Sequence, residues 1–189
     1  MIQKTCTIEQ YALGTRVKAR GNSKITTEVF IELYDQYMPK VFQYFCYRVG
    51  AIDLAEDLTS AVFEKVLKKS NSYSADKASI PTWLFCIAQN VLIDHFRTRE
   101  KRWFVDLGEA HYVASVEASP EKKAIKEEEL RELHKQVSKL SEQEQEIISL
   151  KFGAEMNNRQ IAGVLELSES NVGTILYRAI RKLRGKMIG

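Results

Sequence analysis

The sequence has few of the residues that interrupt helices or cross-link a chain. Its 189 residues include only three prolines, nine glycines and three cysteines. Period-two alternation of apolar and polar residues, which is typical of half-buried strands, is scarce, and the long segments have helical periodicity instead. No apolar run approaches the roughly 20 residues that a membrane-spanning helix needs. The sequence therefore predicts an all-α protein without membrane insertion.

The chain also lacks the residue groupings that bind metals or carry out catalysis. The cysteines and histidines are scattered, without Cys-x-x-Cys spacing: Cys6, Cys46, Cys86, His95, His111 and His134. A metal site requires ligands that converge, and this spacing provides none. No Ser/His/Asp, Cys/His or paired-carboxylate set stands out. We therefore expect no metal, no cofactor and no enzymatic activity, and we expect Cys46 and Cys86 to be small core residues.

Charge and the first residues set further limits. The formal net charge is only +3, so a polyanionic partner has to be inferred from where the charges lie. Residues 1–24 contain no apolar stretch suitable for a signal peptide. We expect them to form a flexible extension of a cytoplasmic protein. Hydrophobic residues make up 44% of the chain, which is sufficient for a packed core.

Helical periodicity divides the rest of the chain into two small domains, 25–102 and 119–189, with an irregular linker at 103–118. In the first domain, Thr26 can cap a helix in which Pro39 predicts a kink or a break. Asp53 and Glu56 have the spacing of a capping box at the start of the next helix. A polar loop over residues 69–78 then precedes the third helix of this domain.

The third helix, residues 79–102, has an apolar stripe on one side and a basic end. Trp83 lies on this stripe, so we expect it in the core rather than on a stacking surface. Asn90 places an amide in the middle of the helix. Four cations gather at the end against a single acid, Glu100: Arg97, Arg99, Lys101 and Arg102. This distribution of charge indicates a polyanionic ligand.

The second domain contains a helix-turn-helix pattern at residues 158–177. Ser119 and Pro120 predict the start of a charged helix that extends to about Leu140. Three further starts are indicated by capping residues: Ser141 with Glu144, Asn157 with Gln160, and Ser168. The last helix is basic, and its first turn is rich in hydrogen-bonding side chains, as a DNA-reading helix requires. Any helical hairpin with the same apolar spacing is the alternative.

Glu166 stands in the turn where glycine is usual. A left-handed conformation costs a residue with a side chain about 1 kcal/mol. We therefore expect a slightly different turn.

Three motifs, in this order, resemble the extracytoplasmic-function group of bacterial sigma factors. The resemblance covers about residues 25–188. The motifs are Ala55-Glu56-Asp57-Leu58-Thr59 with Val62-Phe63 and Val66-Leu67; the segment from Pro81 to Asn90 with Asp94 and Arg97; and Leu140-Ser141-Glu142 with Ile147, Leu150, Gln160-Ile161-Ala162, Val172, Tyr177-Arg178-Ala179 and Leu183. The family fold is two helical domains, regions two and four, on a flexible linker.

The resemblance implies partners and site residues. Family members bind core RNA polymerase and promoter DNA, and an anti-sigma protein often holds them inactive. For opening the minus-ten element, the implied residues are Ser74, Lys77, Asn90, Asp94, Arg97, Arg99, Lys101 and Arg102. For polymerase docking they are Glu56, Asp57, Thr59, Ser60, Phe63 and Glu64. For the duplex minus-thirty-five element they are Ser168, Ser170, Asn171, Thr174, Tyr177, Arg178 and Arg181.

Asn90 matches the position associated with an everted minus-ten base, and an amide can both donate to and accept from a base edge. In the family, the loop at residues 70–78 encloses that base. Gly173 and Ile175 depart from the family, whose members commonly have basic residues there. We therefore expect weak binding to the minus-thirty-five element, with a shallow dependence on salt.

Three alternative classes remain open from the sequence. The first is a helix-turn-helix regulator that acts without polymerase, although the first domain resembles neither a dimerisation nor a ligand-binding domain. The second is an enzyme, which the missing catalytic groupings disfavour. The third is an interaction module that binds polymerase and never DNA.

Overall fold

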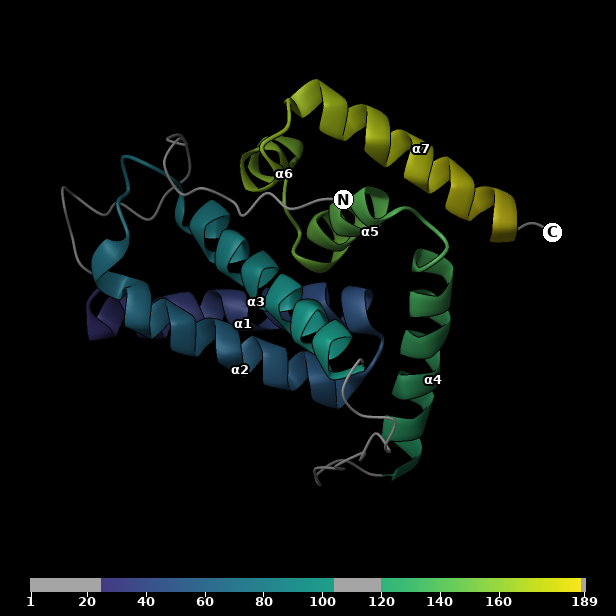
Figure 1. Ribbon diagram of the computed structural model, residues 1–189, viewed down its shortest axis with the longest axis horizontal. Helices are drawn as coiled ribbons and strands as arrows, with labels where there is room; N and C mark the ends of the chain where they lie inside the picture. The colour runs from purple at the N-terminus through teal and green to yellow at the C-terminus, as the bar shows by residue number, and fades with distance from the viewer. Residues whose placement is uncertain (1–24, 104–119, 188–189) are drawn as a thin grey trace.

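The structure is a computed structural model that describes residues 25–103 and 120–187 (Figure 1). Within these ranges the chain forms helices joined by turns, which confirms the all-α prediction. The elements are α1 (Thr27–Val49), α2 (Ile52–Lys69), the short 3-10 turn η1 (Ser70–Ser72), α3 (Ile80–Trp103), α4 (Pro120–Val137), α5 (Glu142–Ile148), the π-helical turn η2 (Ser149–Gly153), α6 (Asn158–Leu165) and α7 (Glu169–Met187). The expected extension at 1–24 and nearly all of the expected linker lie outside the described residues.

Helices α1, α2 and α3 pack into one layered unit, with α2 contacting both of the others. Their shared core includes Val41, Phe45, Val62 and Leu84, none of which has any exposed surface. Trp83 is only 2% exposed, so its predicted place in the core is confirmed.

Two expected helix signals in this unit have different outcomes. Thr26 caps α1 as predicted, since its hydroxyl oxygen accepts a hydrogen bond from the amide of Val29 at 3.4 Å. Of the predicted kink or break at Pro39, the break is excluded, because α1 continues through this residue to Val49. Pro39 is exposed, whereas Leu33 and Val41 on either side are buried in the same core. Packing of both flanks therefore holds the helix together across the missing amide hydrogen.

The predicted capping box of Asp53 is also wrong. The cap of helix α2 lies two residues earlier, at Ala51, which makes no side-chain hydrogen bond, and the helix begins at Ile52. Gly50 explains this start, because its left-handed conformation (φ 66°) ends α1 and turns the chain directly into α2. The two-residue connection leaves no room for a separate polar cap at Asp53.

In the second domain, α4 begins at Pro120 as the sequence predicts, and it ends at Val137 rather than near Leu140. The capping boxes of Ser141 with Glu144 and of Asn157 with Gln160 are both formed. Ser168 accepts a hydrogen bond from the amide of Asn171 at 3.2 Å and so caps α7. Local sequence signals thus determine most of the helix starts in this domain.

The two domains pack directly against each other, which the expectation of two units on a flexible linker did not include. Helix α1 contacts η2 and α4, and α3 contacts α6. Figure 1 shows α5 and α6 lying above α1 and α3, with α7 forming the outer edge. The buried residues of both domains form one continuous core.

Candidate nucleic-acid and polymerase interfaces

One face of α3 carries the residues expected to open the minus-ten element. Asn90 is half-buried, whereas Asp94 and Arg97 are exposed. Their spacing of four and three residues places all three on the same side of the helix. Asp94 also forms an ion pair with Lys65 of α2 at 2.9 Å. The acid in the middle of this face is therefore already paired with a cation, which reduces its repulsion of a phosphate.

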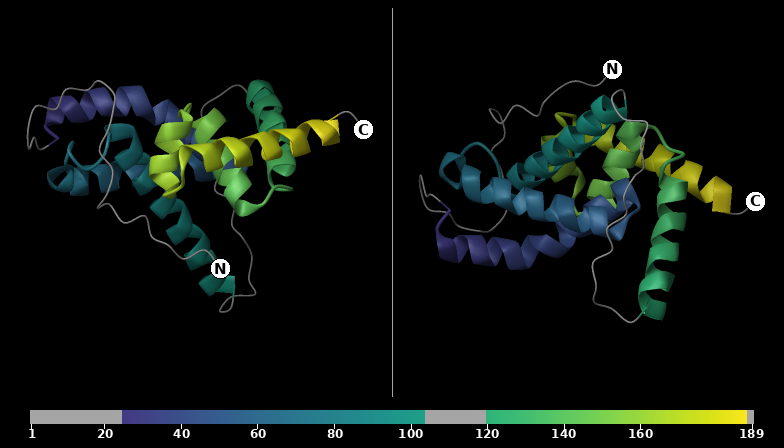
Figure 2. Two further views of the ribbon diagram at one scale, coloured as in Figure 1. Left: turned by 90° about the horizontal axis from the view of Figure 1, so that it is seen from above. Right: turned by 60° about the horizontal axis from the view of Figure 1, so that its bottom comes forward.

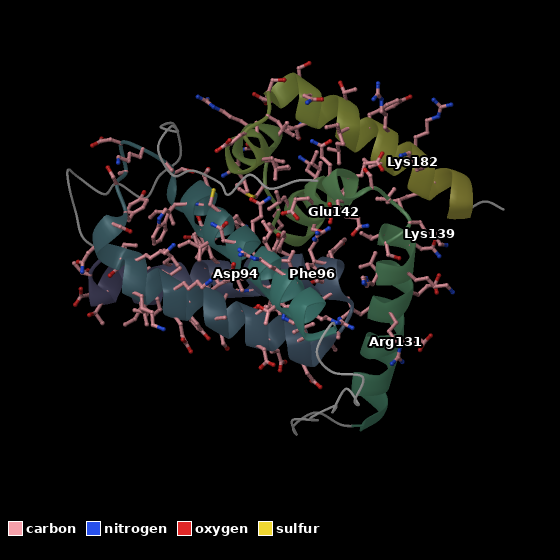
Figure 3. All side chains as sticks on the ribbon, in the orientation of Figure 1. Asp94, Phe96, Arg131, Lys139, Glu142 and Lys182 are labelled. Carbon is pink, nitrogen blue, oxygen red and sulfur yellow. The ribbon has the colours of Figure 1, made fainter. Side chains whose placement is uncertain are left out.

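Exposed apolar side chains lie on the same part of α3, and the sequence did not single them out. Ile93 is 42% and Phe96 is 37% exposed. Figure 3 labels Asp94 and Phe96 on different sides of this part of α3. An exposed aromatic ring beside cations can stack on an unpaired base. The available signal was that Ile93 and Phe96 fall off the apolar stripe that begins at Trp83.

The basic end of α3 extends into solvent. Figure 2 shows the C-terminal half of this helix projecting away from the other helices. Arg97 and Arg99 are exposed. Lys101 and Arg102 belong to the helix, but their side chains lie outside the described part of the chain. Partial burial, followed by the charge of Arg99, lowers the pKa of His95, so this histidine is neutral at pH 7 and adds no charge.

The loop before α3 is attached to the core by an aromatic residue that we did not predict. Tyr73 is 8% exposed, and its ring lies 5.1 Å from that of Trp83, centroid to centroid. Its hydroxyl donates to the carbonyl oxygen of Ala78 at 3.2 Å. Ser74 is half-buried and Lys77 is exposed, within a turn in which the amide of Lys77 donates to the carbonyl of Ser74. A single aromatic residue within a polar loop was the available signal.

Helix α2 presents an acidic face, but two of its expected residues are not on it. Glu56, Asp57, Ser60 and Glu64 are exposed. Thr59 is 6% exposed, because it lies on the apolar side of the helix, where its hydroxyl donates to the carbonyl of Ala55 at 2.7 Å.

Phe63 is 4% exposed, and its ring lies 4.8 Å from that of Tyr34 on α1. We had placed both Thr59 and Phe63 among the docking residues. Both side chains are buried, so neither is accessible to a docking partner in this structure.

The outer face of α7 carries the residues expected to read duplex DNA, and all seven are exposed: Ser168, Ser170, Asn171, Thr174, Tyr177, Arg178 and Arg181. Two of the hydroxyl groups are already engaged locally. Ser168 caps the helix, and Thr174 donates to the carbonyl of Ser170 at 3.0 Å. Tyr177, at 67% exposure, is the most exposed of the large apolar side chains in the described residues. The groups free to contact bases and phosphates are therefore concentrated at Ser170, Asn171 and the positions from Tyr177 onward.

The helix-turn-helix keeps a left-handed turn without glycine. Glu166 has φ 54° and ψ 41°. The amide of Leu167 donates to the carbonyl of Ala162 at 3.0 Å, which closes the end of α6. The turn thus adopts the conformation that a glycine would favour, at a cost of about 1 kcal/mol.

Lys182 on α7 is exposed but is paired with an acid on α5. Its ammonium lies 2.6 Å from Oε1 of Glu144, the capping residue of α5. Figure 3 shows Lys182 on the stretch of α7 that passes α5. Burial alone would raise the pKa of Glu144, but hydrogen bonds from Lys182 and Ser141 outweigh it and hold the pKa below its usual value. This ion pair links α7 to α5.

Two classes of site find no support in the described residues. Among residues 25–103 and 120–187, no group of three or more His, Cys, Asp or Glu side chains is placed to hold a metal ion. No helix in these ranges is long and apolar enough to span a membrane.

Comparison with known protein families identifies both domains. Residues 33–102 match the family described as Sigma-70 region 2, and residues 130–183 match Sigma-70, region 4. The chain is 35% identical over 156 residues to the ECF RNA polymerase sigma factor BldN of Streptomyces coelicolor, covering 82% of this chain and 59% of that protein's length. It is 30% identical over 160 residues to the RNA polymerase sigma factor YlaC of Bacillus subtilis, covering 82% of this chain and 90% of that protein.

Solved structures agree at the level of the fold. The structure of CnrH in complex with the cytosolic domain of CnrY matches with a TM-score of 0.66 at 20% identity, over 86% of this chain and 89% of that one. The sigma factor RpoE of Bartonella quintana, in complex with the anti-sigma factor NepR, matches with a TM-score of 0.65 at 18% identity, over 84% and 96%. Two helical domains in the expected order, an exposed basic helix and a helix-turn-helix, together with these matches, show that the chain belongs to the extracytoplasmic-function group of the sigma-70 family of RNA polymerase sigma factors.

Proposed function

We propose that this chain binds core RNA polymerase, directs it to specific promoters and promotes strand opening there. The observation that carries the proposal is the exposed part of α3, where Asn90 and Arg97 lie on one side of the helix and the exposed ring of Phe96 lies about a third of a turn around it. Taking a base out of the duplex costs a few kcal/mol. An amide for a base edge, a ring for stacking and a cation for the phosphate can together offset that cost.

The second domain would supply the duplex contacts. The free polar groups of α7 lie at its N-terminal end, where a recognition helix meets base edges, and Arg178 and Arg181 follow, where phosphates lie. With Gly173 and Ile175 where the family commonly has cations, and with Lys182 bound to Glu144, few phosphates are neutralised. This supports weak binding to the minus-thirty-five element, with most of the specificity supplied by α3 and by polymerase.

The acidic face of α2 would dock on polymerase through Glu56, Asp57, Ser60 and Glu64. These four side chains are exposed on consecutive turns of one helix, which suits a basic partner surface. Binding to the transcription machinery would place the protein in the cytoplasm. An anti-sigma protein is a further partner that we propose, because both similar solved structures are complexes with a second protein and one of these is described as an anti-sigma factor.

Reconstituted transcription tests this function. Purified chain is added to core polymerase, promoters are mapped after overexpression, and run-off transcription is measured on them. The double variant Asn90→Ala with Arg97→Ala should lose strand opening, detected as permanganate-reactive thymines, and keep its binding to core polymerase. The matched control removes an amide and a guanidinium elsewhere, with Gln143→Ala and Arg131→Ala, both at exposed positions.

Each outcome selects one class of protein. Loss of opening with retained polymerase binding supports the proposal. Unchanged opening by the Asn90 and Arg97 double variant indicates an interaction module that leaves DNA to polymerase. DNA binding without any promoter-dependent transcription indicates a regulator that acts without polymerase.

A further inference from the structure

A buried polar cluster joins the two domains. The hydroxyl of Tyr44 on α1 donates to Oε1 of Glu146 on α5 at 2.7 Å. The guanidinium of Arg48, one turn further along α1, lies with Nε 3.3 Å from Oε2 of the same carboxylate. Nη1 of Arg48 also donates to Oε1 of Gln145 at 3.1 Å. Both carboxylate oxygens of one domain therefore meet side chains of the other.

The cluster is shielded from water. Tyr44 has no exposed surface, Glu146 is 7% exposed, and the Arg48 side chain is 9% exposed. Burying a charge is costly unless it is paired and hydrogen-bonded. Glu146 accepts from Tyr44 and pairs with Arg48, whose Nη1 donates to Gln145 while its buried Nε makes the ion pair without a hydrogen bond. Separation of the domains would return the cluster to water and would break all three interactions at once.

The backbones of the two domains also come unusually close beside this cluster. A Cβ atom added to Gly153, at the end of η2, would lie 2.9 Å from both the Cα and the backbone nitrogen of Tyr44. Only glycine fits here, because the neighbouring atoms are backbone and cannot rotate away. At a second place, a Cβ on Gly163 of α6 would lie 3.2 Å from Cγ2 of Thr82 at the start of α3. The domains therefore fit each other closely at two separate places.

This closed arrangement does not suit simultaneous binding of two promoter elements. The names minus-ten and minus-thirty-five imply a separation of about 25 base pairs, or roughly 85 Å of duplex at 3.4 Å per pair. A compact body of the size of the described residues is only about 40 Å across. The first helix of the helix-turn-helix, α6, packs on α3 itself. The domains must separate for each to reach its own element.

We propose that the Tyr44, Arg48 and Glu146 cluster, with the close approach of Gly153 beside it, is an intramolecular latch that holds the sigma factor in a closed, inactive form. The latch rests on the proposed function, because the open form is the one that binds both promoter elements. Polymerase and promoter would bind only the open form and so stabilise it. A substitution that weakens the latch should therefore lower the polymerase concentration needed for activation.

A single methyl group tests the latch. Gly153→Ala keeps charge and polarity, but its Cβ meets the backbone of Tyr44. Gly173→Ala is the matched structural control, because the nearest atom to its Cβ, in Asn158, is 3.7 Å away. The full chain is labelled for single-molecule energy transfer at Gln36→Cys on α1 and Arg159→Cys on α6, both exposed, in a Cys6→Ser background. Far-UV circular dichroism checks that each variant remains helical.

The expected result is a high-transfer closed population in the parent and in Gly173→Ala, and a low-transfer open population in Gly153→Ala. Tyr44→Phe, which removes only the hydroxyl, should shift the equilibrium toward the open form by about tenfold or more, the effect expected for removing a hydrogen bond to a charged group. At limiting concentrations, both latch variants should bind core polymerase more tightly and start more transcripts than the parent. An exposed control, Glu128→Gln, should not.

Three results would overturn the latch. The parent could be open already, both latch variants could stay as closed as the parent, or they could open without any gain in polymerase binding. Failure of the proposed function can be distinguished from these results. In that case the parent chain, added to core polymerase at saturating concentration, would give no promoter-dependent transcription, whether its energy transfer is high or low.

Discussion

Replacement of Glu144 separates helix capping from the ion pair that links α7 to α5. In Glu144→Ala both interactions are lost, since this carboxylate accepts from the amide and hydroxyl of Ser141 at 3.0 and 3.1 Å and from Lys182 at 2.6 Å. Loss of a capping interaction costs about 1 kcal/mol. The Lys182 side chain is 55% exposed, so solvent screening limits its pair to about 0.5–1 kcal/mol. We expect a total loss of about 1.5–2 kcal/mol from the free energy of unfolding.

Glu144→Gln is the discriminating control. Its amide oxygen can still accept from Ser141, so only the ion pair is lost, and we expect a loss of about 0.5–1 kcal/mol. Urea denaturation, followed by circular dichroism, measures both variants and Lys182→Met, which closes a double-mutant cycle. The pKa of Glu144 is lowered in the fold. Its stabilisation is therefore full above the unfolded pKa of about 4.3 and is lost as pH falls through the folded pKa.

Two results would refute this role of Glu144. A glutamine variant as unstable as the alanine variant would mean that capping contributes nothing. A coupling energy of zero between Glu144 and Lys182 would mean that α7 is oriented by apolar packing alone.

Further predictions concern the turn, the histidines, the DNA-reading helix and the corrected docking face. Glu166→Gly should raise the free energy of unfolding by about 0.5–1 kcal/mol, because it relieves a left-handed residue, and urea denaturation measures this. Burial, with a smaller effect of a neighbouring arginine, lowers the pKa of His95 and His134. Their stabilisation is full above the unfolded pKa of about 6.5 and is lost as pH falls through the lower folded values, so unfolding midpoints measured between pH 7.5 and 5 should fall. Arg178→Ala should reduce the slope of log K for promoter DNA against log salt by about one, and an unchanged slope would exclude a phosphate contact. Thr59→Val should leave polymerase binding unchanged and should alter only stability, because this hydroxyl faces Ala55.

Local signals predicted much of the fold because they act over a few residues. The capping boxes at Ser141 and Asn157 formed as expected, since a side chain and an amide three residues away meet whenever the helix forms. The predicted break at Pro39 and the predicted capping box at Asp53 did not form. Tertiary packing carried α1 through its proline, and a tight glycine turn moved the start of α2.

The candidate site was predictable where residues share one helix face. The resemblance singled out Asn90, Asp94 and Arg97, and their helical spacing places them on one side of α3. The resemblance named Thr59 and Phe63 for docking, and only the packing of α2 shows that both side chains are buried. Tyr73 and Phe96 were missed because whether they are buried or exposed depends on neighbours that lie far away in the sequence.

The sequence by itself determined the helices, most of their caps, the two-domain order and the family, because each depends on short-range periodicity or on motifs at characteristic spacing. The tertiary structure alone decided how the domains meet. Tyr44 and Glu146 are 102 residues apart, and nothing in the local pattern of either residue indicates the other. Their hydrogen bond, the pairing of Arg48 and the fit of Gly153 arise only when two apolar surfaces from different domains bury each other, because burial makes each polar group there require a partner.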